Sequence, residues 1–312
     1  MIAFAGRRLL LLVVTVLAAT ALIFALSAAL PGDPGRLILG PFAPQDAVDR
    51  MNVRLGADRP LAVRYVVWLG DMLRGDWGRS YAFERPVLAL VLERLRVSAR
   101  LAGAAVAVLV PVTVGASLLA ASRPGGVFDR TVGLAALAIG ALPEFVTGVL
   151  LAAVFGLWLG LLPVQGGGGA GPAGLVLPVA TLVLLLFGYL FRVLRAGLVE
   201  AAASEYARMA AFKGLSPAAV LLRHALPNAA PPALAVLGAQ IGWLVGGLVV
   251  VETLFQVPGL GALLLAAATN KDLPLLVGGT VAVTIAFAVG NLLADLAHTS
   301  LDPRLRHVGR NG

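Results

Sequence analysis

Long uncharged runs of apolar residues alternate with short charged segments along most of this chain. Residues 9–30, 101–122 and 273–294 each form such a run without a charged side chain. A bilayer core about 30 Å thick needs roughly 20 apolar residues for each helical crossing. Each of these runs therefore predicts one membrane-spanning helix.

Two further regions complete the pattern. Residues 145–191 carry no charge but contain the stretch GGGGAGPAG at 166–174, which cannot remain helical, so we expect two spans joined by a turn. Residues 225–251 predict another span. The fold class is therefore all-α, a polytopic membrane protein with six transmembrane helices at about 9–30, 100–122, 131–158, 174–194, 229–251 and 275–297.

The first apolar run could be mistaken for a secretory signal peptide because it follows Arg7 and Arg8. Its length exceeds that of a usual signal-peptide core, and the following LPGDPGR has no small-x-small cleavage site. We therefore interpret this run as a retained first span.

Composition supports a membrane protein. The 312 residues are 59% hydrophobic and only 13% charged, which is outside the range of soluble globular domains. The absence of cysteine excludes disulfides and thiolate metal sites. A net charge of +8 could indicate nucleic-acid binding in a soluble protein, but here the basic residues flank predicted spans, so we expect no nucleic-acid partner.

The basic residues also set the orientation. The two short connections at 159–174 and 252–272 hold Lys271 as their one basic residue. Because cytoplasmic loops carry an excess of Lys and Arg, we predict that both termini are cytoplasmic (N-in, C-in). The basic residues assigned to the cytoplasmic side are Arg7, Arg8, Arg123, Arg130, Arg192, Arg195, Arg208, Lys213, Arg223, Arg304, Arg306 and Arg310.

The predicted organisation has four parts, in chain order. They are the first transmembrane helix at 1–30, an extracytoplasmic helical insertion at 31–97, a five-helix core at 98–300 that contains a cytoplasmic hairpin at 200–227, and a cytoplasmic tail at 301–312.

Glycines repeat every four residues in the fifth predicted span, at Gly238, Gly242 and Gly246. This spacing places them on one helical face, where another helix could approach closely. Glycine is also common in membrane helices without such a role, so both interpretations stand.

Few ionisable residues lie within the spans. Glu144, next to Pro143, could line a transport pathway, or it could hold helices together through an ion pair or hydrogen bond. Asp295 lies near Asn291 and His298, where structural hydrogen bonding is the expectation. The histidines have no partner at metal-ligand spacing, and we assign no metal site.

The cytoplasmic segment 204–228, SEYARMAAFKGLSPAAVLLRHALPN, is unusually polar for this chain. Helix-favouring residues predict one helix over 200–213, and Gly214 is placed to end it in a left-handed conformation. Ser216-Pro217 then predicts the start of a second helix that runs to about Leu226. Pro227 and the pair Pro231-Pro232 mark the entry to the fifth span.

The first helix of this hairpin carries Tyr206, Met209, Ala210 and Lys213 at three- and four-residue spacing, which predicts one exposed face. Such a face could lie in the lipid interface or bind a protein. The helix is mostly alanine and has little apolar bulk for lipid anchoring, so the composition favours a protein partner.

The spacing of the hairpin resembles a known signature. Arg208-Met209-Ala210, three residues, Gly214, nine residues, His224, one residue and Leu226-Pro227 are similar to the E-A-A-x3-G-x9-I-x-L-P signature of ABC importer permeases. Arginine at the first position is typical of the dipeptide/oligopeptide/nickel branch. The string Glu200-Ala-Ala is a decoy because it lies too far before Gly214.

Other segments resemble the same branch, in the same order along the chain. They are LPGDP at 30–34, the predicted third span at 141–163, the outer segment at 249–276 and the C-terminal end at 291–306. The resemblance implies the type I ABC importer permease fold and a coupling helix that binds an ATPase. The residues that it assigns to ATPase coupling are Glu205, Tyr206, Arg208, Met209, Ala210, Lys213, Gly214, Leu215, Leu226 and Pro227.

The resemblance implies a non-enzymatic permease subunit of the bacterial plasma membrane, with multiple spans. The chain has no G-x4-G-K-[ST] phosphate-binding loop, so ATP and Mg²⁺ are expected in a separate subunit. The implied partners are two cytoplasmic ABC ATPase subunits or domains, an extracytoplasmic substrate-binding protein and a second, related permease chain that forms a heterodimer. The implied cargo is dipeptides or oligopeptides.

Alternative functions remain open from the sequence. The same machinery could import nickel chelates or other small solutes. An ion-coupled secondary transporter would show inverted repeats and paired ionisable residues at mid-membrane, and the sequence shows neither. A membrane-embedded enzyme would need a clustered His/Asp/Glu set or a G-x-S-x-G turn, which the sequence also lacks.

Overall fold

Every regular element in the described part of the chain is a helix. The computed structural model describes the backbone of residues 2–29, 34–40, 42–54, 56, 58–167 and 171–301. The side chains at 2–5, 7–8, 28–29, 34, 37–38, 54, 241–243, 245–247 and 293–301 lie outside this description. Within these limits the expectation of an all-α protein is confirmed.

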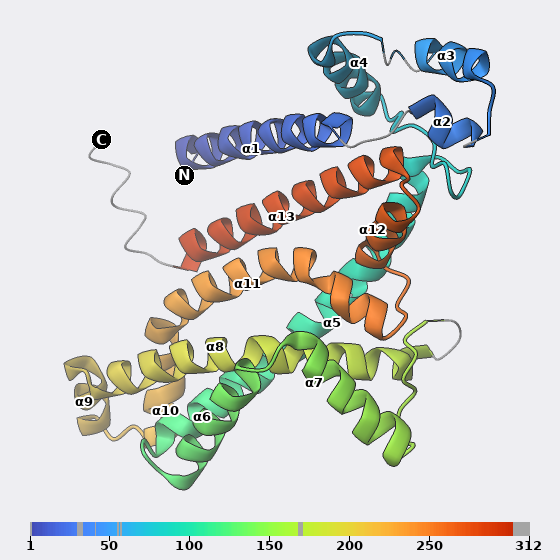
Figure 1. Ribbon diagram of the computed structural model, residues 1–312. Helices are drawn as coiled ribbons and strands as arrows, with labels where there is room; N and C mark the ends of the chain where they lie inside the picture. The colour runs from blue at the N-terminus through green and yellow to red at the C-terminus, as the bar shows by residue number, and fades with distance from the viewer. Residues whose placement is uncertain are drawn as a thin grey trace.

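Five long helices form the body of the protein. α1, α13, α11 and α8 lie next to one another in this order, and α5 packs against α8 and α11 (Figure 1). Their bounds are α1 (Ile2–Ala29), α5 (Val87–Ser122), α8 (Val176–Ala203), α11 (Leu226–Leu254) and α13 (Leu273–Leu301).

Among the described residues, four helices are long and apolar enough to cross a membrane, or five if one bent pair counts as a single span. The four are α1, α5, α8 and α13. α11 has 29 residues, which at 1.5 Å per residue is also long enough to cross, although several of its side chains lie outside the description.

The predicted third span, 131–158, is not one continuous helix. α6 (Val127–Gly140) ends before Pro143, and α7 (Glu144–Leu151) starts after it at an angle of 109° between the two halves. α7 then continues as the π-helical segment η1 (Ala152–Trp158). Proline has no backbone N–H and disfavours helical geometry in the residue before it, so it separates the two helices.

Two spans extend furthest beyond their predicted bounds. α5 begins at Val87 rather than near residue 100, and α8 continues to Ala203 rather than ending near residue 194. The apolar-run criterion detects only the uncharged part of a helix. Long charged side chains such as those of Arg96 and Arg100, both exposed, can reach the headgroup region and water, so the helix itself can continue past that part.

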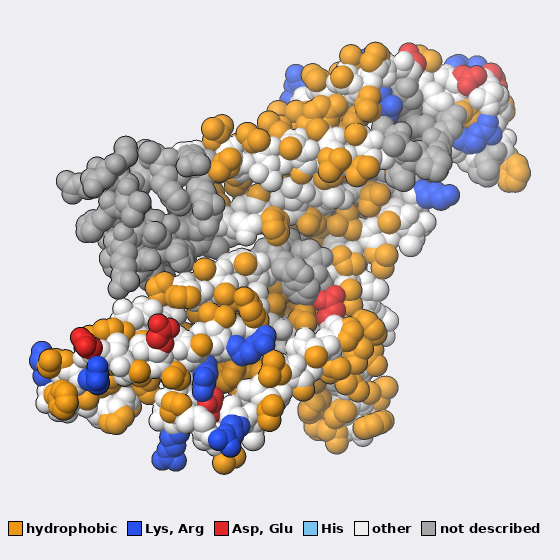
Figure 2. All heavy atoms as spheres, turned by 60° about the vertical axis from the view of Figure 1, so that its left-hand side comes forward, with side chains coloured by type: hydrophobic (Ala, Val, Ile, Leu, Met, Phe, Trp, Pro, Cys, Tyr) orange, Lys and Arg blue, Asp and Glu red, His pale blue; other side chains and the backbone are white. Residues whose placement is uncertain are grey.

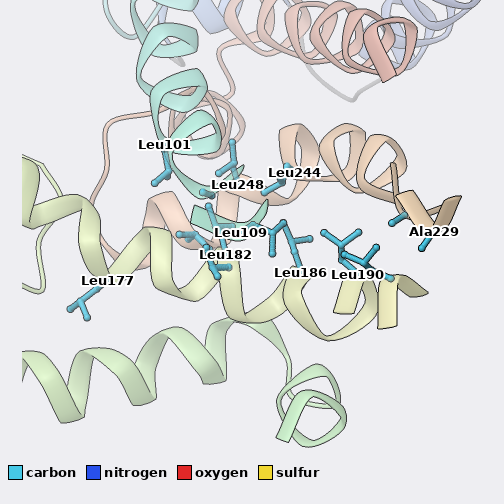
Figure 3. Close-up of a cluster of buried hydrophobic side chains, with 14 of the residues drawn as sticks. Leu101, Leu109, Leu177, Leu182, Leu186, Leu190, Ala229, Leu244 and Leu248 are labelled. Atoms are coloured by element: carbon cyan, nitrogen blue, oxygen red, sulfur yellow. The ribbon is translucent and has the colours of Figure 1, made fainter. Parts of the chain in front are cut away.

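The largest buried cluster lies where α5, α8 and α11 meet. Figure 3 shows Leu101 and Leu109 from α5 facing Leu182 and Leu186 from α8, with Leu248 from α11 beside them. Lipid tails are as apolar as leucine, so this packing contributes through close contact rather than through removal of apolar surface from water.

Glycine allows one very close approach within this core. A Cβ atom on Gly188 of α8 would lie 2.6 Å from the carbonyl oxygen of Ala136 on α6, so only glycine fits there. Of the three glycines proposed as a packing face, Gly238 is buried on α11, whereas Gly242 and Gly246 lie outside the described side chains.

The end of the protein at which α1 ends and α13 starts holds the short helices between α1 and α5, and we call it the outer end after the predicted orientation. They are α2 (Pro34–Leu39), α3 (Gln45–Arg54) and α4 (Leu61–Leu73). α4 contacts α1 through a hydrogen bond of 2.9 Å between the hydroxyls of Tyr65 and Thr20. At the same end lies α12 (Leu260–Thr269), which packs against α5 and α13 with Leu260 and Leu263 buried.

Candidate functional site

A short helical hairpin projects from the end of α8, at the same end of the molecule as the start of α1 and the end of α13 (Figure 1). Its first arm is α9 (Glu205–Phe212). Its second arm consists of α10 (Pro217–Val220) and the π-helical turn η3 (Leu221–Ala225), which leads into α11. The hairpin thus connects two spanning helices.

The first arm begins with a sharp break at Ser204. Its backbone is extended (φ −69°, ψ 161°), and its hydroxyl donates to the carbonyl oxygen of Ala201 at 2.6 Å. The expected single helix over 200–213 is therefore wrong: residues 200–203 belong to α8. Serine readily bonds to nearby backbone groups and so competes with helix continuation. Glu200 accordingly lies on α8 and not on the projecting arm.

The turn at Gly214 has the geometry that the sequence predicted. Gly214 has a φ of +85°, and its N–H donates to the carbonyl oxygen of Ala211 at 2.9 Å. The N–H of Leu215 donates to the carbonyl oxygen of Ala210 at 3.4 Å. These two bonds form a Schellman motif, which satisfies carbonyl groups at the end of α9.

Substitution of Gly214 is expected to act through backbone conformation rather than through steric clashes. An added Cβ would meet no atom within 4 Å, but a left-handed conformation costs an alanine roughly 1–2 kcal/mol. Gly214→Ala should therefore destabilise the hairpin by about 1 kcal/mol, and Gly214→Asn by less. Hydrogen exchange of the α9 amides would measure this difference. Unchanged protection in both variants would contradict a conformational role for Gly214.

The second arm begins as predicted but continues further. The Ser216 hydroxyl accepts from the N–H of Ala219 at 3.3 Å, and Pro217 occupies the first helical turn. The expectation that Pro227 and Pro231-Pro232 separate this arm from the fifth span is wrong, because helical backbone continues from 217 to 254. Pro227 lies just after the π-helical turn η3, inside this continuous helix, and membrane helices tolerate internal prolines.

The inner face of the hairpin is a small apolar cluster. Ala207 and Ala210 of α9 are buried against Val220 of α10, and Leu215 packs on the same cluster. Ala210 was assigned to the exposed face, and this is wrong: only 6% of it is exposed. The alanines are small enough to let the two arms lie close together, so they fix the shape of the hairpin.

The outer face of α9 is exposed and mixed in character. Tyr206, Met209 and Phe212 are 44%, 58% and 84% exposed. The basic residues Arg208 and Lys213 are exposed beside them, and Figure 2 shows charged side chains next to hydrophobic ones at this end. Sequence reasoning missed Phe212, although its spacing of three from Met209 was a usable signal.

The remaining predicted hairpin residues differ in their environments. Glu205 lies 3.9 Å from Arg208, but both side chains are largely exposed, so this ion pair contributes little stability. Leu226 is half-buried against the α8 core, whereas Pro227 is exposed.

A buried carboxylate joins three helices at the outer end. Glu252 of α11 is fully buried, and it accepts from the hydroxyl of Ser98 on α5 at 2.5 Å and from the N–H of Ala262 on α12 at 3.0 Å. The Ser98 oxygen in turn accepts from the N–H of Leu260 at 2.8 Å. A Cβ on Gly259 would lie 2.1 Å from this carboxylate, so any larger residue there would displace the carboxylate from these hydrogen bonds. We refer to Ser98, Glu252 and the start of α12 as the outer latch.

A second buried carboxylate lies near the outer latch. Asp272 accepts from the Ser80 hydroxyl at 2.5 Å and from the N–H of Ala82 at 3.0 Å. It also accepts from the N–H of Leu275 at 3.2 Å and so caps α13. Burial, together with the charge of Asp272, raises the pKa of the nearby Tyr81 phenol. The sequence analysis assigned 252–272 to an outer connection. It did not predict that Glu252 and Asp272 would each join several segments through buried hydrogen bonds.

Among the described residues, the in-span acid Glu144 stands apart from other ionisable groups. Glu144 occupies the first turn of α7 and is half-exposed, with no hydrogen-bond or ion-pair partner among the described residues. The side chains of Asp295 and His298 lie outside the description. No group of three or more His, Cys, Asp or Glu that could hold a metal ion occurs in the part of the chain that the structure describes.

Comparison with known proteins extends over almost the whole chain. Residues 113–307 match the family of binding-protein-dependent transport system inner membrane components, and residues 1–102 match the N-terminal domain of such membrane components. Both the hairpin and the outer latch residues Glu252 and Gly259 lie in the larger match.

Individual relatives are similar over most of their length. A peptide ABC transporter permease protein of Sinorhizobium fredii is 38% identical over 91% of this chain and 93% of its own. A peptide transport system permease protein of Brucella abortus is 37% identical over 92% of this chain and 93% of its own. The glutathione transport system permease protein of Escherichia coli is 32% identical over 96% of this chain and 98% of its own.

Proposed function

Because this chain belongs to the family of binding-protein-dependent transport system inner membrane components, we propose that it imports dipeptides or oligopeptides and is driven through its projecting hairpin. The chain is the multi-pass permease subunit of such an importer in the plasma membrane. Membership in the family implies an ATPase and a substrate-binding protein as partners. The single observation that carries the coupling proposal is the exposed outer face of α9 on a hairpin between two spanning helices.

The hairpin can act as a stiff lever. It is attached to α8 through Ser204 and runs into α11 without a break in helical backbone. A force applied to α9 by a partner would therefore be transmitted to both spans. We propose that Tyr206, Arg208, Met209, Phe212 and Lys213 contact the ATPase.

The other proposed coupling residues have supporting roles. Ala210, Gly214 and Leu215 keep the two arms together, and Leu226, where the second arm joins α11, packs on the core. Glu205 and Pro227 are exposed and could contact the partner at the margin of the outer face.

Further partners belong to the same proposal. ATP and Mg²⁺ would bind to two separate ATPase subunits or domains, since this sequence has no phosphate-binding loop of the Walker type. A second, related permease chain would complete the pathway as a heterodimer. The chain itself would then act as a transport subunit without enzymatic activity of its own.

A peptide cargo is supported by the names of three relatives, two of them peptide permeases and one a glutathione permease. Nickel chelates or other small solutes are the alternative. We propose Glu144 as a pathway residue because it lies at the break of the third span, where an acid is costly unless it faces water or a partner.

Uptake of a labelled dipeptide is the test of this function. The chain would be reconstituted in liposomes with its partner permease, ATPase and binding protein. We expect accumulation that requires both ATP and the binding protein, because this chain has no energy source of its own. Uptake without ATP or partners would overturn the importer mechanism. ATP-dependent uptake of a nickel chelate but of no peptide would overturn the cargo only.

A further inference from the structure

A shallow groove runs between α6 and α8 at the end of the molecule that carries the hairpin. Its volume is about 490 Å³. Both helices contribute basic and apolar side chains to it, and its main lining residues are Arg130, Arg192, Arg195, Leu134, Leu137 and Phe191. Neither the family match nor the coupling proposal assigns a role to this groove.

The groove has an excess of positive charge. The positive charge of Arg195 is neutralised by Asp129. Arg195 donates two hydrogen bonds to the Asp129 carboxylate, from Nε at 2.9 Å and from Nη2 at 2.5 Å. Asp129 is 8% exposed and also accepts from the N–H of Gly125 at 2.8 Å, so this pair is fixed in place. Arg130 and Arg192 form no ion pair within the described residues, and three arginines with one aspartate leave a net charge of +2.

Arg192 is held in position at the edge of the groove. Its Nε donates to the carbonyl oxygen of Gly188 at 3.2 Å, and its guanidinium lies 5.9 Å from the ring centre of Tyr189. Its terminal nitrogens have no partner in the described part of the chain. A guanidinium group with free donors in a fixed plane matches the oxygens of a phosphate.

The apolar residues of the groove favour a lipid over a soluble anion as its ligand. Leu134 and Leu137 of α6 are 68% and 48% exposed, and they extend from the arginines toward the middle of the broken span. A free phosphate ion would gain nothing from these side chains, whereas an acyl chain could lie along them. Tyr189, 52% exposed beside Arg192, is typical of the headgroup level of a bilayer.

We propose that this groove binds an anionic phospholipid. Its phosphate lies between Arg130 and Arg192, and one acyl chain lies along Leu134 and Leu137. Basic pockets between spanning helices on the cytoplasmic side are suited to anionic headgroups. The proposal is independent of the cargo and of the coupling residues.

Quenching by brominated lipids tests the proposal directly. The chain has no cysteine, so Ala138→Cys, at an exposed α6 residue next to Leu137 and outside the groove lining, provides a single site for a fluorophore. The labelled chain, assembled with cysteine-free partners in nanodiscs, would be compared with brominated phosphatidylglycerol and brominated phosphatidylcholine. We expect a preference for phosphatidylglycerol of about 10- to 30-fold, since each arginine near the surface contributes about fivefold.

Two charge variants complete the experiment. The double variant Arg130→Gln/Arg192→Gln should abolish the preference for phosphatidylglycerol. The matched control, Arg123→Gln with Arg223→Gln, removes equal charge from exposed residues outside the groove and should retain it. A preference that survives in the first variant would overturn the proposal, as would equal quenching by both lipids. Quenching by neither lipid would also overturn it, because a protein chain would then cover the groove.

Discussion

Replacing both Met209 and Phe212 with aspartate is expected to reduce ATP-driven transport by more than about 100-fold while leaving the permease folded. Both side chains are more than half exposed, so the substitution removes little packing within this chain. Within an interface, by contrast, an unpaired carboxylate costs several kcal/mol to bury, and each 1.36 kcal/mol corresponds to a factor of ten. Uptake in liposomes and retention of the ATPase subunit during purification would measure the effect.

A matched control uses Val127→Asp. Val127 is 82% exposed at the start of α6, at the same end of the molecule, and an acid at a helix N-terminus is tolerated. This variant should transport normally. If Met209→Asp with Phe212→Asp still bound the ATPase and transported at the normal rate, the outer face of α9 would not be the coupling surface.

Replacing Glu252 with alanine is expected to destabilise the outer end of the protein by about 2–5 kcal/mol. The substitution leaves the buried N–H of Ala262 without an acceptor and the Ser98 hydroxyl without its carboxylate. Each buried group left unsatisfied costs roughly 1–3 kcal/mol. Thermal unfolding in nanodiscs and hydrogen exchange of the α12 amides would report the loss.

Two further variants separate the outer latch from a general effect of charge. Gly259→Ala should destabilise the outer end similarly although Glu252 itself is retained, because the new Cβ would displace the Glu252 carboxylate. Glu93→Gln removes an acid whose ion pair with Arg85 is about half exposed, and it should change stability by less than about 1 kcal/mol. Normal α12 protection in Glu252→Ala would show that the latch does not hold α12.

The sequence predicted where the chain is helical and apolar better than it predicted where helices bend. Apolar runs identified the spans because a bilayer imposes a minimum length on any crossing. The same runs could not show that the third span breaks at Pro143 while α11 continues through Pro231 and Pro232. Proline tends to break a helix, but neighbouring helices decide whether the freed backbone groups are satisfied.

In the hairpin, local chemistry determined the turn and tertiary packing determined the faces. Gly214 and Ser216-Pro217 could be interpreted from the sequence because caps depend on the few residues around them. Ala210 was assigned to the wrong face and Phe212 was missed, because the direction in which α9 lies depends on the break at Ser204 and on the contact with Val220.

The sequence by itself determined the class of this protein, its helical composition and the position of the turn at Gly214, since these follow from hydrophobicity and short-range backbone preferences. Only the tertiary structure decided that Glu252 joins α5, α11 and α12, and that Arg130 and Arg192 border one groove. These groups are far apart along the chain, so their contacts depend on how the helices pack, and no local pattern specifies that packing.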